Sequence, residues 1–131
     1  MRRIEQNGLF DKIVNSVVGF LNQQGFSAVR ANSSGFAPPT KVQWDEKDRG
    51  VVPDITGEYN GALYVFEIET GQQIETAKVE DRWKLLSVHA RRFNGKFYLV
   101  IPEPSANDVQ EIAEGLDLEA EYLKLRGVEN A

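Results

Sequence analysis

The chain contains 131 residues, a length typical of one domain, so we expect residues 1–131 to form a single domain. Apolar residues make up 41% of the sequence and charged residues 27%, proportions that exclude wholesale disorder. There is no cysteine and only one histidine. Disulfides, thiol nucleophiles and metal sites built from cysteines or several histidines are therefore excluded.

Membrane and export signals are lacking in the sequence. The longest apolar run, Ala62–Phe66, is far shorter than the roughly 20 residues that cross a bilayer. The segment Met1–Gln6 lacks the apolar stretch of a signal peptide. We therefore expect a cytoplasmic protein with no membrane association.

The net charge of −5 argues, taken alone, against a nucleic-acid partner. Eight of the twenty acidic residues, but only two of the fifteen basic ones, lie from Glu103 onward. Residues 1–102 are therefore close to neutral, and they become basic if a metal holds three of their acids. We interpret the acidic C-terminal part as a solvated helix face, with a decoy of nucleic acid as the alternative.

The N-terminal third predicts a helix, a strand and a long loop. Residues 4–24 repeat apolar side chains with the period of an amphipathic helix, and Gly25 follows as a stop. Residues 26–30 read as a short strand. Residues 31–50 lose periodicity, and a loop of this length in a compact domain is usually functional.

The rest of the chain predicts a hairpin followed by alternating helices and strands. Asn60-Gly61 lies between two strand-like runs within residues 51–70, a strong signal for a two-residue turn. Residues 75–90 predict a helix with Trp83 in the core, and residues 97–101 a strand covered on both faces. Ser105 and Asp108 resemble a capping box for a helix to about Leu116, and residues 119–125 predict a last strand. This order indicates an α/β fold with a mixed sheet between helices.

The hairpin register places three carboxylates together. A two-residue turn at Asn60-Gly61 sets Asp54 opposite Glu67, and Glu69 shares the face of Glu67 because side chains alternate along a strand. Opposed like charges destabilise a sheet unless something compensates them. Mg²⁺ (or Mn²⁺) favours such oxygen ligands, so we expect a metal site at these residues. The alternative is an exposed face with solvated acids.

These residues resemble the PD-(D/E)XK nuclease superfamily: Pro53-Asp54 is followed by Glu67-Ile68-Glu69. The nearest likeness is to archaeal Holliday junction resolvases, over roughly residues 8–102, through Gly25-Phe26, the Ser33-Ser34-Gly35 loop and Arg91-Arg92-Phe93-Asn94-Gly95. The resemblance implies a restriction-endonuclease-like α-β-β-β-α-β core, here with an added C-terminal helix and strand. It also implies DNA as partner, Mg²⁺ at the acids and a homodimer.

The sequence departs from this pattern at one position, since the superfamily usually has lysine where this chain has Glu69. Glu69 can accept a proton or help to hold metal and water. In other members a motif residue has moved to the following helix. By that resemblance Lys84 is a candidate catalytic residue, with Lys78 as a further candidate and solvated surface lysines as the alternative.

Other residues are candidates for contacts with DNA or water. The loop combines aromatic and basic side chains, which suit base stacking and phosphate contacts, although the tryptophan could instead pin the loop to the body. Asp11, on the first helix, could hold a metal-bound water or be ordinary surface; Arg91 and Arg92 could contact phosphates, while His89 is expected to be structural. The predicted DNA-binding residues are Arg30, Lys41, Trp44, Lys47 and Arg49.

The leading hypothesis is a metal-dependent endonuclease that hydrolyses DNA phosphodiester bonds, with Asp54, Glu67 and Glu69 as metal-binding and catalytic residues. A second hypothesis is a catalytically lapsed nuclease fold that binds DNA or a protein. A third is a small interaction domain whose acidic face meets a basic partner.

Overall fold

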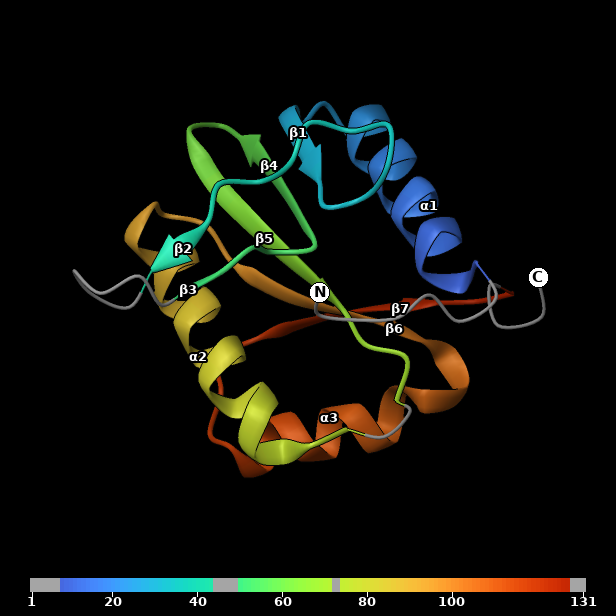
Figure 1. The fold of residues 1–131 in the computed structure, drawn as a ribbon, viewed down its shortest axis with the longest axis vertical. Coiled ribbons are helices and arrows are strands. Elements are labelled where there is room, and N and C mark those ends of the chain that lie inside the picture. The colour runs from blue at the N-terminus through green and yellow to red at the C-terminus, as the bar shows by residue number, and fades with distance from the viewer. Residues whose placement is uncertain (1–7, 44–49, 72–73, 128–131) are drawn as a thin grey trace.

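The computed structural model describes residues 8–43, 50–71 and 74–127. It shows an α/β fold in which one mixed sheet lies between helices (Figure 1). In chain order the elements are α1 (Leu9–Gln23), β1 (Ser27–Ala31), β2 (Val42–Gln43), β3 (Gly50–Val51), β4 (Ile55–Tyr59), β5 (Ala62–Ile68), α2 (Thr76–Arg92), β6 (Phe97–Pro102), the 3₁₀ turn η1 (Glu103–Ser105), α3 (Ala106–Gly115) and β7 (Glu121–Leu125).

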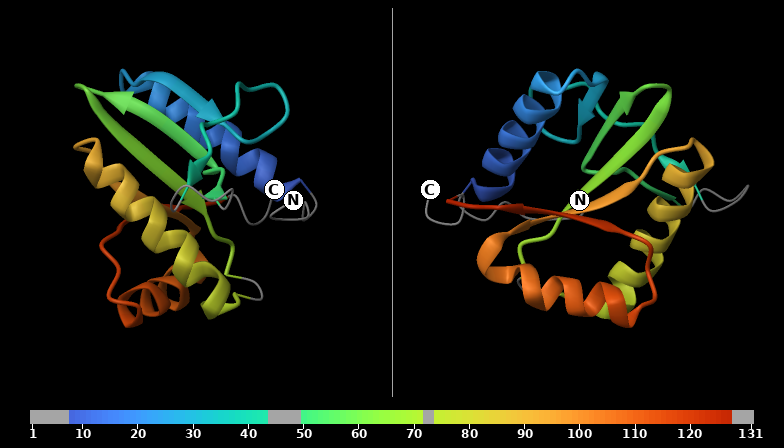
Figure 2. Two further views of the ribbon diagram at one scale, coloured as in Figure 1. Left: turned by 60° about the vertical axis from the view of Figure 1, so that its left-hand side comes forward. Right: turned by 180° about the vertical axis from the view of Figure 1, so that it is seen from behind.

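The central sheet has the strand order β1-β4-β5-β6-β7. β1, β4 and β5 pair antiparallel, whereas β5, β6 and β7 pair parallel. Parallel neighbours need long crossovers, which α2 and α3 supply. Both of these helices cover one face of the sheet, and α1 covers the other (Figures 1 and 2). The predicted restriction-endonuclease-like architecture is confirmed.

The β4–β5 hairpin forms as the sequence predicts. Asn60 and Gly61 both have positive φ, at 51° and 78°, as a type I′ turn requires. Pairing runs from Tyr59 with Ala62 down to Ile55 with Phe66, so Asp54 comes next, opposite Glu67. Proline cannot donate to a ladder, and β4 begins only after Pro53.

The two faces of the sheet have separate apolar cores. On the α1 side, Ile55, Phe66 and Ile68 pack with Val17 and Leu21 of the helix. On the α2 and α3 side the core consists of alternate strand residues and one stripe from each helix, namely Val65, Phe97, Leu99, Ile101, Trp83, Leu86, Ala90, Val109 and Ala113. Trp83 is fully buried, which confirms its predicted place.

The sequence predicts residues 31–50 as a loop without secondary structure, and this prediction is partly wrong. Val42 and Gln43 pair with Val51 and Gly50 in a separate two-stranded sheet. Strands of two residues have too few side chains to show an alternating pattern, so this pairing left no periodicity to read.

The predicted helix is confirmed as α3, with Ser105 at its N-cap position, but the predicted capping box does not form. Residues Glu103–Ser105 form η1 before α3 begins, and Ser105 has φ −96° and ψ −2°, already in the helical region. A capping side chain needs extended backbone to reach the first amides. Ser105 accordingly makes no side-chain cap hydrogen bond.

The Arg-Arg-Phe-Asn-Gly motif turns the chain from α2 into β6. The Phe93 carbonyl accepts a hydrogen bond from the Leu63 amide at 3.1 Å. A Cβ at Gly95 would overlap the Leu63 backbone, so glycine allows the two segments to touch. Within the three ranges that the structure describes, no helix is both long and apolar enough to span a bilayer.

Candidate active site

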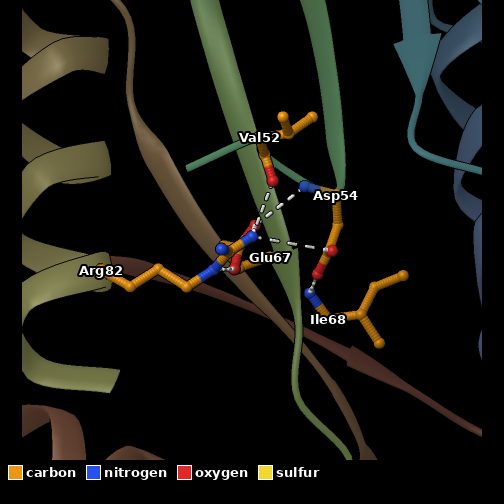
Figure 3. A network of polar contacts seen from close by, with 5 residues as sticks. All are labelled: Val52, Asp54, Glu67, Ile68 and Arg82. Atoms are coloured by element: carbon orange, nitrogen blue, oxygen red, sulfur yellow. Dashed lines mark hydrogen bonds and ion pairs between the residues drawn. The ribbon is translucent and has the colours of Figure 1, made fainter. Parts of the chain in front are cut away.

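Asp54 and Glu67 are joined by reciprocal hydrogen bonds at the open end of the hairpin. The Asp54 amide donates to Glu67 Oε2 at 2.8 Å, and the Ile68 amide donates to Asp54 Oδ2 at 2.8 Å (Figure 3). Pairing of β4 starts at Ile55, so the Ile68 amide lies beyond the ladder and is satisfied by a side chain. The two carboxylates are almost fully buried, with exposed fractions of 1% and 0%.

A guanidinium from α2 meets these carboxylates. Arg82 reaches across to the hairpin, where its Nε donates to Glu67 Oε1 and its Nη2 lies 3.1 Å from Oε2 (Figure 3). The same Nη2 donates to the Val52 carbonyl at 2.7 Å and lies 4.0 Å from Asp54 Oδ1. Arg82 therefore ties α2 to both strands of the site.

The electrostatics of the site explain how it remains buried. Burial by itself lowers the pKa of Arg82, but attraction to Glu67, reinforced by their hydrogen bond and by Asp54 and Glu69, outweighs burial and raises that pKa above its ordinary value. Buried charges are tolerated when they are paired and hydrogen-bonded. Arg82 therefore supplies positive charge that compensates the acidic cluster, a role for which the sequence predicted a divalent metal.

Glu69 lies on the same side of the sheet, as the alternation predicts, and is 5% exposed. Its Oε1 accepts a hydrogen bond from the Gly71 amide at 3.3 Å, and its charge adds to the attraction on Arg82. The alternative of solvated acids is excluded for all three carboxylates, since each is buried.

The two lysines considered on α2 lie elsewhere. Lys84 is half-exposed and pairs with Glu80 at 2.7 Å, and exposed Lys78 pairs with Glu75 at 3.1 Å. Neither of these contacts involves Asp54, Glu67 or Glu69. Sequence reasoning looked for a cation on this helix but considered only lysines, and so missed Arg82. An available signal was its place one turn before Leu86, beside the buried helix stripe.

The donor chemistry of the site suits a hard divalent cation. Asp54 Oδ1 and Glu67 Oε2 converge on one point, and carboxylate oxygens are ligands that Mg²⁺ favours. That point holds Arg82 Nη2, and no group of three or more metal-ligating side chains occurs among the residues that the structure describes. Two of the predicted ligands thus converge on one position, while Glu69 bonds to the Gly71 amide.

Asp11 is connected to the site by residues 32–33 of the loop that follows β1. Its Oδ1 accepts a hydrogen bond from Ser33 Oγ at 2.8 Å, and the neighbouring Asn32 amide donates to the Asp54 carbonyl at 2.8 Å. The first-helix carboxylate therefore anchors the loop that adjoins Asp54.

The predicted DNA-binding residues are placed only in part. Arg30 and Lys41 are exposed, and Arg30 lines a cavity of about 390 Å³ together with Thr56, His89 and Phe93. Arg30 pairs with Thr56 across β1 and β4, on the face that carries Asp54. Trp44, Lys47 and Arg49 lie outside the described residues. Arg91, another of the basic candidates, pairs with Glu119 at 2.7 Å.

The family model described as archaeal Holliday junction resolvase matches residues 14–123, a range that contains Asp54, Glu67, Glu69 and Arg82. A search of curated proteins finds no match.

Proposed function

The chain belongs to the archaeal Holliday junction resolvase family, and on that premise we propose that it is a metal-dependent endonuclease that hydrolyses phosphodiester bonds in branched DNA. One observation carries the proposal: the hairpin register sets Asp54 against Glu67 in a buried, hydrogen-bonded pair on the face covered by α2. The pair directs two carboxylate oxygens at one position, an arrangement that a hard divalent cation favours.

In this proposal Asp54 Oδ1 and Glu67 hold Mg²⁺ or Mn²⁺. When bound, the ion lowers the pKa of water and offsets negative charge on the phosphate. The Ile68 amide orients Asp54, and the Asp54 amide orients Glu67. Rigid backbone donors of this kind keep both oxygen ligands in place.

Glu69 takes the remaining task, which is proton transfer. Water attacks phosphorus and its proton passes to the Glu69 carboxylate. The bond from phosphorus to the sugar oxygen breaks, and that oxygen leaves with the bonding electrons and takes a proton from solvent. A carboxylate can act as this general base. Glu69 therefore replaces the usual motif lysine at a position where lysine would instead stabilise charge.

Contacts with DNA complete the proposal. Arg30 and Lys41 are exposed on the described part of the surface, and with Trp44, Lys47 and Arg49 we assign them to phosphate contacts and base stacking. A four-way junction has two-fold symmetry, and two copies of this chain would present one site to each of two strands. We place this activity in the cytoplasm.

The test is cleavage of labelled four-way junctions and linear duplexes with Mg²⁺, using wild type, Asp54→Asn and Glu67→Gln. We expect both variants to lose on the order of 100-fold or more in rate, since a catalytic metal supplies several kcal/mol. Glu111→Gln, which removes an exposed acid from α3, is the matched control and should cleave normally.

Cleavage by Asp54→Asn at the wild-type rate would refute the assigned site. Binding of junctions by the wild type without any cleavage, and without metal uptake, would instead establish the lapsed DNA-binding module.

A further inference from the structure

The position between Asp54 and Glu67 has room for one cation. Arg82 Nη2 lies 3.1 Å from Glu67 Oε2 and 4.0 Å from Asp54 Oδ1. A magnesium ion held by both oxygens would sit about 2.1 Å from each, in the space between the carboxylates that this nitrogen faces. Two positive groups so close also repel strongly in a buried site. Metal and guanidinium cannot share the position.

We propose that Arg82 is a built-in counter-cation of the site, and that its guanidinium and a divalent metal are alternative occupants of the position between Asp54 and Glu67. The inference rests on the proposed function only in that it concerns the same metal site.

The contacts of Arg82 fit an occupant that is held firmly and can still leave. Nε and Nη2 both engage Glu67, and Nη2 also holds the Val52 carbonyl; Nη1 takes part in none of these contacts. The Arg82 side chain is also more exposed than either carboxylate, at 13% against 1% for Asp54 and 0% for Glu67. Its departure therefore uncovers carboxylates that a phosphate could not otherwise reach.

The charges favour exchange. Asp54, Glu67 and Glu69 carry three negative charges, and Arg82 neutralises one of them. A divalent ion neutralises two, so the metal can displace the guanidinium, and its apparent affinity is reduced by the free energy of releasing Arg82.

The experiment measures Mn²⁺ binding to DNA-free protein by calorimetry, with wild type, Arg82→Gln and Lys84→Gln. We expect Arg82→Gln to bind Mn²⁺ at least about tenfold more tightly than wild type, because no guanidinium must be displaced. Lys84→Gln removes a cation from the same helix that pairs only with Glu80 on the surface, so its affinity should match wild type. Adding Asp54→Asn to Arg82→Gln should abolish the gain.

Thermal unfolding gives a second readout. Without metal, Arg82→Gln should melt below wild type because Glu67 loses its partner, and Mn²⁺ should raise its melting temperature more than that of wild type. If the variant does not fold alone, refolding in Mn²⁺ but not in Na⁺ supports the proposal, and failure in both overturns it.

Equal or weaker Mn²⁺ binding by folded Arg82→Gln would also overturn the proposal and make Arg82 a positioning residue for Glu67. If wild type cleaves DNA in that case, the proposed function stands alone. Tighter metal binding by the variant, with no cleavage by wild type, would leave the inference standing and remove the proposed function.

Discussion

At the open end of the β4–β5 hairpin the two faces are both buried but chemically opposite. Ile68 and Glu67 are adjacent, and both have an exposed fraction of 0%. Ile68 packs against the α1 side with Ile55 and Phe66, where burial of apolar surface is itself favourable. Glu67 faces α2, where burial is unfavourable unless Arg82 meets it.

This difference shows that one register serves two purposes. Because side chains alternate, the Asn60-Gly61 turn that aligns the apolar residues for α1 also sets Asp54 opposite Glu67. A slip of one residue would turn the acids toward the apolar α1 side and the apolar set toward α2 and Arg82. The stability of one face therefore holds the chemistry of the other in place.

The largest expected effect comes from leaving Glu67 buried without its partner. Arg82→Met should lower the free energy of unfolding by about 3–5 kcal/mol, the usual loss when one member of a buried ion pair is removed. Arg82→Met combined with Glu67→Met should recover most of that loss, because a buried pair can often be replaced by apolar side chains without net destabilisation.

Urea unfolding in EDTA measures these changes without interference from metal. The quantity that tests the prediction is the coupling free energy between positions 82 and 67, obtained from the two single variants and the double variant. Additive losses in the double variant would mean that the α2 face does not depend on the pair.

A smaller effect is expected on the apolar face. Ile68→Ala should lower the free energy of unfolding by about 2–4 kcal/mol through lost burial and a cavity, equally with and without Mn²⁺. Val88→Ala, a truncation at a 38% exposed position of α2, should change it by less than about 0.5 kcal/mol.

Metal dependence separates the two faces in this comparison. Stabilisation by Mn²⁺ that differs between Ile68→Ala and wild type would show that the α1 face takes part in metal binding, contrary to our expectation.

The sequence could predict the hairpin but not what completes it. Register follows from a local turn and an alternation of period two, so the opposition of Asp54 and Glu67 was visible in the residues. Which residue of α2 reaches the strands depends on how the crossover helix packs, which is a tertiary property. Arg82 and Lys84 are only two residues apart in the sequence but about 200° apart around a helix. One side chain therefore reaches the site while the other lies in solvent.

The smallest expected effect contrasts two bases on the same helix. For Arg82 the attraction of carboxylates exceeds the effect of burial, whereas for His89 burial, followed by repulsion from Arg92, lowers the pKa below its usual 6.5. His89 packs against Phe93 with ring centres 5.0 Å apart, and Arg30 and Glu58 line the same cavity. No partner outweighs burial here.

The sign of the pH dependence follows from that shift. Below pH 6.5 the unfolded chain binds a proton at this histidine more readily than the folded chain does, so its contribution to stability is complete above pH 6.5 and is lost as the pH falls through the lowered pKa. Urea unfolding of wild type and His89→Gln between pH 5 and 8 measures it by difference, which removes the shared titration of the carboxylates. We expect the stability of wild type to fall relative to the variant below pH 6.5, by less than either effect above. If the unfolding free energies of wild type and His89→Gln changed with pH in parallel, protonated His89 would cost the folded state nothing. On α2, the need of a buried charge for a partner would then be shown only at Arg82.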